Sequence, residues 1–447
     1  MFPKFFDTYN LILVAVYLLL FFLIIKFIGA VKYRENDKLK KLFTWAFLVK
    51  VGSGIMFALI YEYIYKWGGD TYSYFRQSSA LGDVLFTYPS AYFKHLFGFV
   101  TRGNIGLIPS NIGYYPHFSD PQMYAIHRFL SPFTILGLKN YYLIGIVLNF
   151  FLFLINWKFF SFVSKFFPDR KKLIAIAILF VPSVLFWSSG LNKDAFTFSF
   201  ALLFIVGFHN LFFKFRINFW NVFYLIFSAY IVLALKPYIL YSLLISSVIW
   251  LGFSYLQRVK NRILRVFVFP IIMLSLGFAG LYVFSTISSS VGGAYKDVDS
   301  MLSKATIAQR DLKQEYYKGS AFDIGDYDAS IEGAMSVTPA AIMAGLFRPF
   351  VWEARSAVVL LSGLENFVLL LLTLYLLFVV GIKRVVSSVA KNPFLIFCLV
   401  FSLSMAMGIG LSTSNFGALV RFKIPLVPFF VMFLLFIRED YKKEKSL

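Results

Sequence analysis

The sequence contains little cysteine and histidine and lacks nucleotide-binding motifs, and each shortage narrows the chemistry available to it. Its single cysteine, Cys398, lies in an apolar run, so a disulfide framework or a thiolate metal site is excluded. The four histidines, at positions 95, 117, 127 and 209, have no ligand spacing. We therefore expect no cofactor; a divalent metal stays open, but no residue pattern supports one. The chain also lacks the glycine-rich phosphate-binding phrases GxGxxG and GxxxxGK[ST].

Apolar residues dominate what is present. Hydrophobic residues make up 59% and aromatic residues 20% of the 447 residues, whereas charged residues make up only 15%. Apolar runs long enough to cross a bilayer recur along the whole chain, which is too many for one soluble core. The sequence predicts an all-α polytopic integral membrane protein. Its transmembrane helices, about eleven in number, are expected at 10–31, 42–64, 141–163, 173–190, 195–213, 218–235, 237–256, 266–288, 357–382, 393–411 and 423–437.

Basic residues gather in clusters between alternate pairs of these spans. In a soluble protein a formal net charge of +21 would suggest a nucleic-acid partner, but here the position of the charges decides their meaning. All clusters fall on one side of the membrane if the N-terminus is outside and the C-terminus is cytoplasmic. We therefore expect that orientation in a bacterial inner membrane, with no nucleic-acid partner. The clusters are 32–41, 165–172, Lys214 with Arg216, 258–265, Lys383 and Arg384 with Lys391, and 438–445.

This orientation divides the chain into parts and leaves two long external segments. The expected parts are a first transmembrane hairpin (1–64), an external segment with interfacial helices (65–140), central transmembrane helices (141–288), an external helical cap (289–353), and C-terminal helices with a basic cytoplasmic tail (354–447). Within the external parts, 83–100 and 301–318 should form helices that lie along the membrane. Each is too polar or too interrupted to cross it.

Charged residues interrupt several apolar phrases near the expected external face. Such groups are costly inside a membrane, so they should line a polar cavity and have partners. Together the cations could bind a phosphate or pyrophosphate on a lipid, whose tail needs an apolar groove beside them. The candidates are Asp70, Lys193, Asp194, Lys236, Arg348, Glu353, Arg355, Glu365, Arg421 and Lys423.

The phrase WGGDTYSYF (67–75) holds the candidate catalytic residue. Asp70 could serve as a general base for a hydroxyl nucleophile. Trp67 offers a flat face for a sugar ring, and Tyr72 can bring a hydroxyl to the same rim. Alternatively, Asp70 caps the interfacial helix that follows it, because aspartate is a preferred residue at that position.

The other candidates have structural alternatives as well. Lys193 and Asp194 could neutralise each other at a helix start. Lys236 could be a snorkelling lysine, and Arg421 could anchor the last helix to lipid headgroups. The functional interpretation rests on the whole set of charges, which comes from distant parts of the chain and faces one side.

The phrase GGDTYSYF, in which Gly68 and Asp70 precede Tyr74, resembles the G-x-D-x-x-x-Y phrase of O-antigen and exopolysaccharide polymerases. An early external aspartate followed by interfacial helices also resembles the GT-C superfamily of polyprenyl-phosphate-dependent glycosyltransferases, although their frequent acidic pair is a lone Asp70 here. The resemblance implies a polyprenyl-linked sugar donor, with Arg348 and Arg421 in the place of the polymerases' functional arginines.

Two other classes of function remain open. A flippase for lipid-linked glycan would also need cations and an apolar groove. A non-catalytic subunit of an envelope assembly machine would use the 289–353 cap to dock partner proteins. The expected partners are therefore a polyprenyl-linked sugar, membrane lipid and, in the last case, envelope-assembly proteins.

Overall fold

The computed structural model describes residues 4–66, 68–100, 120–259, 297–314 and 321–446. Within these ranges the chain is helical and has no strand; one isolated β-bridge joins Ala321 to Asn415. The chain forms two compact units. Unit 1 comprises residues 1–163, 184–203 and 227–236, and unit 2 comprises residues 164–183, 204–226 and 237–447. The all-helical class expected from the sequence is confirmed.

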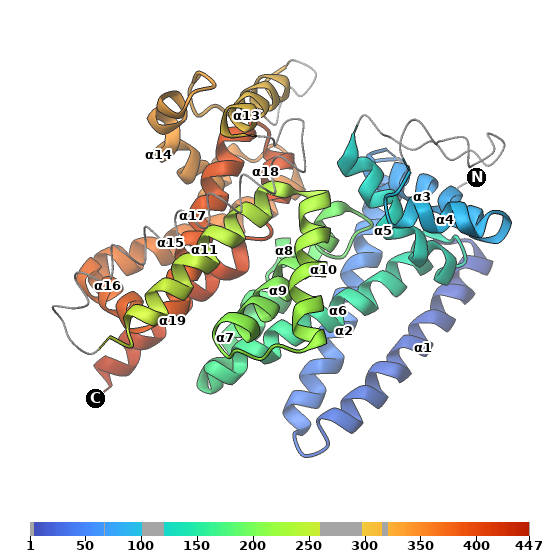
Figure 1. The fold of residues 1–447 in the computed structure, drawn as a ribbon, viewed down its shortest axis with the longest axis horizontal. Coiled ribbons are helices and arrows are strands. Elements are labelled where there is room, and N and C mark those ends of the chain that lie inside the picture. The colour runs from blue at the N-terminus through green and yellow to red at the C-terminus, as the bar shows by residue number, and fades with distance from the viewer. Residues whose placement is uncertain (1–3, 67, 101–119, 260–296, 315–320, 447) are drawn as a thin grey trace. The chain divides into compact units, whose positions relative to one another are not determined.

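Unit 1 contains the N-terminal helices and the start of the central ones (Figure 1). A short turn joins α1 to α2, and the side chain of Asn36 accepts a hydrogen bond from the Leu39 amide to begin α2. Asp120 begins α5 in the same way. The helices are α1 (Thr8–Lys32), α2 (Asp37–Leu59), η1 (Ile60–Ile64), α3 (Asp70–Thr87), α4 (Pro89–Leu96), α5 (Pro121–Leu136), most of α6 (Tyr141–Phe166) and α8 (Pro182–Trp187), and parts of α9 (Lys193–Phe212) and α10 (Phe219–Leu235).

Unit 2 contains the remaining helices, and α17 packs most extensively against α14, α11 and α19. Ser330, Ser356 and Asn392 each begin a helix with a side-chain cap. The helices are η4 (Pro168–Arg170), α7 (Lys171–Ala175), η5 (Ile176–Phe180), α11 (Pro237–Leu256), α13 (Val298–Leu312), α14 (Ile331–Phe347), η8 (Val351–Glu353), α15 (Ala357–Tyr375), η9 (Leu376–Gly381), α16 (Ile382–Lys391), α17 (Pro393–Ser412), α18 (Phe416–Phe422) and α19 (Val427–Lys445).

Seven helices in the described ranges are long and apolar enough to cross a membrane, and an eighth is counted if the bent pair α18 and α19 forms one span. The chain is thus a multi-pass membrane protein by the length and composition of its helices. The seven are Thr8–Lys32, Asp37–Ile64, Tyr141–Phe166, Lys193–Phe212, Pro237–Leu256, Val359–Lys391 and Pro393–Ser412. The expected number of about eleven stays a prediction, and its span at 266–288 lies outside the described residues.

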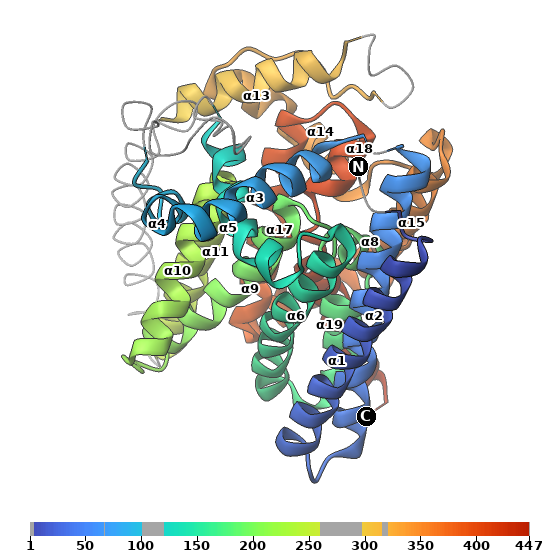
Figure 2. The same cartoon turned by 90° about the vertical axis from the view of Figure 1, so that its right-hand side faces the viewer.

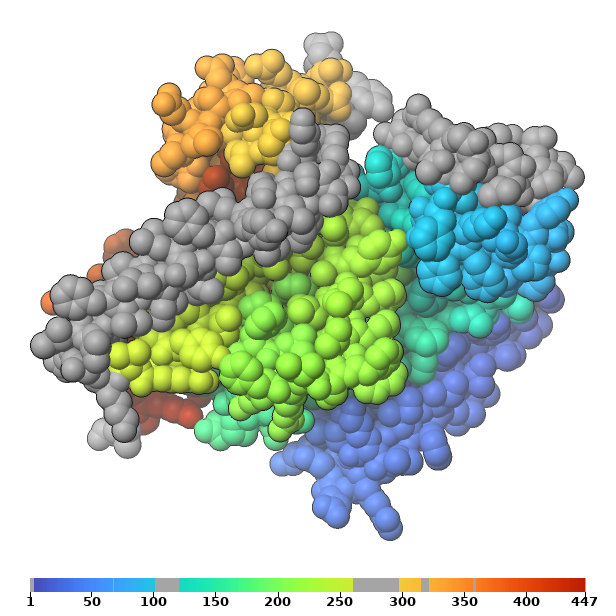
Figure 3. Space-filling view, in the orientation of Figure 1, coloured from blue at the N-terminus to red at the C-terminus, as the bar shows by residue number. Residues whose placement is uncertain are grey.

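Three expected spans differ from single long helices. Residues 173–190 are interrupted, because Pro182 has no amide hydrogen and holds Val181 in an extended conformation between η5 and α8. The span at 423–437 contains the turn after α18 and the first part of α19, and these two helices meet at an angle of 67°. The span at 218–235 is α10, an apolar helix of 17 residues. Figure 3 shows α10 on the outside of the molecule, where Phe219 and Trp220 are exposed.

The two segments expected to lie along the membrane are largely helical where the structure describes them, and residues 315–318 lie outside the described residues. The segment 83–100 contains the end of α3 and all of α4, and neither qualifies as a span. Figures 1 and 2 both place α3 and α4 at the end of unit 1 opposite the basic turn between α1 and α2. In unit 2, residues 301–312 lie in α13, which both views place opposite the C-terminus. Each unit therefore has a basic segment at one end and helices that do not qualify as spans at the other; that these helices lie along a membrane stays a prediction.

Candidate functional site

Two candidate sites emerge, one in each unit. The first, which we call the Asp194 site, consists of Tyr74, Lys193, Asp194 and Lys236 in unit 1. The second, the Arg348 site, consists of Arg348, Glu353, Asn366 and Lys423 in unit 2.

The loop of residues 188–192 positions the Asp194 site. The side-chain oxygen of Asn192 accepts a hydrogen bond from the Ala195 backbone amide at 2.8 Å and thereby begins α9. The side-chain nitrogen of Asn192 donates to the carbonyl of Trp187 at 3.0 Å. Gly190 is required in this loop, because a Cβ there would come within 2.5 Å of the Phe57 ring. The loop therefore fixes where the first residues of α9 lie.

Asp194 is fully buried, with 1% of its side chain exposed, and forms an ion pair with Lys236, whose side chain is 8% exposed. Lys236 lies between α10 and α11, directly before Pro237. Removing one partner of such a buried pair leaves an uncompensated charge, which is strongly destabilising. The alternative in which Lys236 only snorkels toward water does not fit this geometry, since its ammonium group is buried against a carboxylate.

Lys193 lies beside this pair and contacts α3. Its Nζ atom is 5.7 Å from the centre of the Tyr74 ring, which is 1% exposed, a cation–π geometry. The Tyr74 ring also lies 6.2 Å from the His127 ring of α5. The charged start of α9 is therefore packed against the buried face of α3.

Asp70 is the first residue of α3 and is exposed. The residue before it, Gly69, occupies the cap position with φ of 91°, which glycine adopts without strain. Asp70 lies one helical turn before Tyr74, the residue whose ring Lys193 contacts. The expected role of Asp70 as the helix cap is wrong, because Gly69 holds that position. As a carboxylate in the first turn, Asp70 still stabilises the helix electrostatically.

Tyr72 anchors the other side of α3. Its ring stacks on that of Tyr141 at 4.7 Å, and the neighbouring Thr71 hydroxyl makes a hydrogen bond of 2.7 Å with the Tyr141 hydroxyl. Burial raises the pKa of the Tyr72 phenol, so it stays protonated at neutral pH. The expected role of Tyr72 at a substrate rim stays a prediction, because its ring is buried against α6; Trp67 lies outside the described residues.

Lys50 was not singled out in the sequence, yet it holds the same loop from α2. Its Nζ atom donates to the Ser188 carbonyl at 2.8 Å and to the Ser188 hydroxyl at 3.2 Å, and the lysine is 3% exposed. From α6, the Asn149 amide donates to the Ser189 carbonyl at 2.7 Å. A lone lysine inside the apolar run WAFLVKVGSGIMF was the signal that could have identified it.

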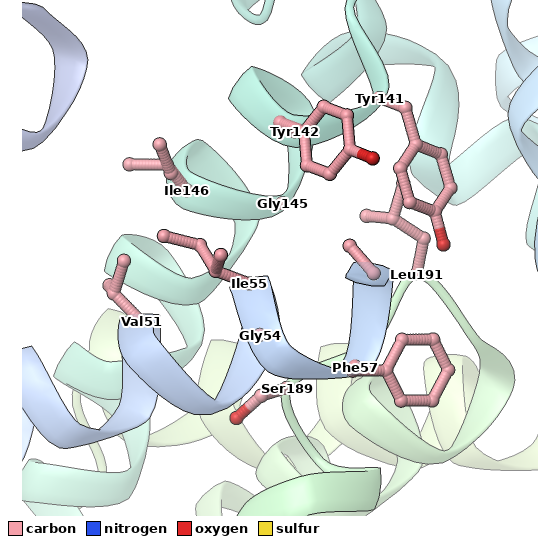
Figure 4. A pocket seen from close by; sticks show the side chains of 11 residues that line it. Val51, Gly54, Ile55, Phe57, Tyr141, Tyr142, Gly145, Ile146, Ser189 and Leu191 are labelled. Atoms are coloured by element: carbon pink, nitrogen blue, oxygen red, sulfur yellow. The ribbon is translucent and has the colours of Figure 1, made fainter. Parts of the chain in front are cut away.

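A small pocket lies beside this loop in unit 1 (Figure 4). Gly54, Tyr141, Tyr142 and Ser189 are among the residues that line it. Its volume of about 10 Å³ is close to what a single water molecule needs. This pocket therefore holds no lipid-linked sugar in the described conformation.

The Arg348 site depends on close packing of α14 against α17. A Cβ on Gly345 would lie 2.3 Å from the Ala406 carbonyl oxygen, and one on Gly410 would lie 2.1 Å from that of Ala341. Small residues four positions apart on both helices allow this contact, as is common between membrane helices. The segment 289–353, expected as an external cap, thus also contains an apolar helix that packs along a candidate span.

Lys423 fixes the end of α14. Its Nζ atom donates to the carbonyls of Leu346 at 3.1 Å and Arg348 at 3.2 Å, and to the side-chain oxygen of Asn366 at 2.5 Å. Lys423 is 1% exposed. Because these acceptors include the last carbonyls of a helix, the ammonium also compensates the negative end of the α14 dipole.

Arg348 is held by polar and aromatic partners. Its guanidinium donates to the Asp323 carbonyl at 2.9 Å, pairs with Glu353 at 2.7 Å and lies 5.1 Å from the centre of the Phe322 ring. The second carboxylate oxygen of Glu353 accepts a hydrogen bond from the Phe350 amide at 2.9 Å. Arg348 and Glu353, both candidates from the sequence, are therefore direct partners.

The remaining candidates lie around this site or elsewhere in unit 2. Arg355 is exposed just before α15, and Arg421 lies half-buried on α18, two residues before Lys423. Glu365 on α15 accepts hydrogen bonds from the Ser183 amide at 2.9 Å and the Ser183 hydroxyl at 2.6 Å, at the start of α8. That the four cations Lys193, Lys236, Arg348 and Arg421 grip one headgroup stays a prediction, because they divide between the two units.

Comparison with known proteins adds no further constraint. No protein-family model, curated protein or solved structure matches the chain. In the part of the chain that the structure describes, no group of three or more histidine, cysteine, aspartate or glutamate residues could hold a metal ion.

Proposed function

We propose that the chain is a glycosyltransferase or glycan polymerase of the bacterial inner membrane, which uses a polyprenyl-(pyro)phosphate-linked sugar at the external face. One observation carries the proposal. Tyr74 joins the helix headed by Asp70 to Lys193, next to the buried pair of Asp194 and Lys236. Lys193 thus contacts α3, which begins with Asp70 and lies at the end of unit 1 opposite its basic turn.

A transfer reaction needs one group that activates the acceptor and another that stabilises the leaving group, and these residues can supply both. Asp70 accepts the proton of an acceptor hydroxyl, whose oxygen attacks the anomeric carbon of the donor sugar. The bond between that carbon and the lipid (pyro)phosphate oxygen breaks, and the phosphate leaves with the electron pair. Lys193 stabilises the charge that develops on the leaving group. The pair of Asp194 and Lys236 holds the start of α9 in place. When Asp194 is displaced, the Lys236 ammonium binds the lipid phosphate instead.

The Arg348 site supplies a second cationic group for the same substrate class. Arginine suits phosphate because its planar fork can make two parallel hydrogen bonds. Glu353 orients the Arg348 guanidinium through their ion pair, and Lys423 fixes the Arg348 backbone through a hydrogen bond to its carbonyl. In this proposal Arg348 and Arg421 bind the anionic part of a donor or of the growing glycan.

Reconstituted protein tests the proposal. The donor is supplied as a fraction of lipid-linked saccharides extracted from the native host after the gene for this chain has been deleted. Unused donor should accumulate in that strain. Purified chain in liposomes should convert that fraction to longer or transferred glycan, detected by mass spectrometry. Absence of any product from wild-type protein with this fraction would contradict the proposal.

The interrupted helix favours one alternative, a flippase for the same lipid-linked glycan. Non-helical backbone among membrane helices is typical of transporters. Here the helix is interrupted at Val181 and Pro182, and the amide of the next residue, Ser183, donates a hydrogen bond to Glu365. A fluorescent lipid-linked sugar in the same liposomes separates the two functions. A flippase moves the label across the bilayer without changing its mass, whereas a transferase changes its mass.

A further inference from the structure

Three segments far apart in the sequence meet at the basic end of unit 2. Arg170 pairs with Asp440, Lys443 lies 3.5 Å from Asp169, and Arg384 lies 3.8 Å from Glu444. Figure 1 shows α16 beside the C-terminal end of α19, in agreement with their packing contacts. We call the surface formed by residues 168–172, 382–391 and 438–446 the basic surface.

The basic surface carries far more positive than negative charge. It contains ten basic and four acidic residues, and three of the acids are used in the ion pairs above. Several lysines outside those pairs are exposed, so their charge is available to a ligand. They are Lys171, Lys172, Lys383, Lys391, Lys442 and Lys445.

Exposed apolar side chains border these lysines. α16 contains no buried residue, and Ile382 and Val386, one turn apart, are each 59% exposed. Phe378 in η9, before the positive-φ residue Gly381 that precedes α16, is 81% exposed. A short helix with lysines beside an exposed apolar face is typical of elements that lie at the membrane interface.

We propose that the basic surface is a binding site for anionic phospholipid. The lysines contact the phosphate of the headgroup, and the acyl chains lie against Phe378, Ile382 and Val386. A soluble phosphate compound would match the charge but would leave the apolar face unused, which is why a lipid is the favoured occupant. The ion pairs keep the three segments together, so the lysines converge on one headgroup instead of acting as separate surface charges. This inference does not depend on the proposed enzymatic function.

Native mass spectrometry of the purified full chain measures the dissociation constants for cardiolipin, phosphatidylglycerol and phosphatidylcholine. The test variant is Lys171→Gln, Lys172→Gln and Lys383→Gln together. The matched control, Arg34→Gln, Lys38→Gln and Lys41→Gln, removes the same charge from the basic turn between α1 and α2. All six residues are exposed, so both proteins should fold, which their unchanged unfolding temperatures would verify.

We expect cardiolipin and phosphatidylglycerol to bind wild type more tightly than phosphatidylcholine, and the test variant to lose about a hundredfold in affinity, since each cation near a headgroup contributes severalfold. The control should retain wild-type affinity. Equal losses in the test and control variants would overturn the proposal, because any positive surface would then suffice. Full displacement of the lipid by excess glycerol phosphate would also overturn it, since the site would then recognise phosphate without the chains.

Discussion

Asp194 in the first turn of α9 is buried against Lys236, which lies at the junction of α10 and α11. This relationship links two of the sequence candidates through a carboxylate and an ammonium that are both withdrawn from water. A buried pair of this kind makes separable predictions about stability and about function.

Asp194→Asn should destabilise the protein, because it leaves the buried Lys236 ammonium without its counter-charge. Breaking one side of a buried pair typically costs about 3–5 kcal/mol. The double variant Asp194→Leu with Lys236→Met removes both charges and should recover most of the thermal stability. If Lys236 binds the donor phosphate, the double variant should still bind polyprenyl pyrophosphate more weakly than wild type. Stable protein with unchanged binding would assign the pair a purely structural role.

Lys423→Met should release the end of α14 from Asn366 and lose the hydrogen bonds to the Leu346 and Arg348 carbonyls. Several buried acceptors would then be unsatisfied, each at a cost of about 1–3 kcal/mol. We expect a large fall in the thermal unfolding temperature. Lys165→Met, which removes an exposed lysine from the same unit, is the control and should be nearly silent. Equal behaviour of the two variants would show that Lys423 does not fix this helix.

Gly410→Ala should separate α14 from α17, since the added Cβ would lie 2.1 Å from the Ala341 carbonyl oxygen. Gly408 lies on the same helix and has nothing within 4 Å of a Cβ built there. Gly408→Ala is therefore the matched control. Thermal unfolding and protein yield should fall for the first variant alone, and an unaffected Gly410→Ala protein would exclude the close helix contact.

Cysteine labelling tests the expected orientation. Cys398, the single natural cysteine, is buried, so an impermeant maleimide should label wild type poorly. Asp326→Cys, at a side chain that is 93% exposed, should be labelled in intact spheroplasts. Ser446→Cys, next to the basic tail, should be labelled only after permeabilisation. Labelling of both in intact spheroplasts, or of Ser446→Cys alone there, would disprove the orientation.

The helical membrane class could be predicted from the sequence because apolar runs of bilayer length have few other interpretations. The breaks within those runs were harder to predict. Pro182 marks the interruption of 173–190, but whether a proline kinks or breaks a helix depends on what satisfies the freed groups; here the carboxylate of Glu365 does so, from a distant segment. In α14, Ala341 and Gly345 carry little hydropathy, so their role in close helix packing was not evident.

The candidate site, like the fold, could be predicted from the sequence only in part. The cost of placing charge in an apolar phrase identified Asp194, Lys236 and Arg348. The sequence did not reveal which charge pairs with which, because Asp194 had a nearer neighbour in Lys193. Pairing of Asp194 with Lys236 depends on how three helices end in space. Lys50 was overlooked because it is a single charge within a long apolar run. It nevertheless donates hydrogen bonds to the loop that precedes α9.

The most direct test of the central claim is glycan transfer by Asp70→Asn protein. Asparagine keeps the shape of aspartate and loses only the modest first-turn electrostatic stabilisation of about 0.3–1 kcal/mol, so fold and yield should be preserved, but it cannot accept the proton of an acceptor hydroxyl. The control is Asp83→Asn, which changes a partly exposed carboxylate on the same helix that pairs with Lys139. The rate is measured in liposomes with the lipid-linked saccharide fraction described above.

The account predicts that Asp70→Asn lowers the transfer rate by about 10²–10⁴-fold, whereas Asp83→Asn retains the wild-type rate and both proteins keep the wild-type unfolding temperature. Transfer by folded Asp70→Asn protein at the wild-type rate would contradict the account and leave Asp70 as a residue that only stabilises the start of α3.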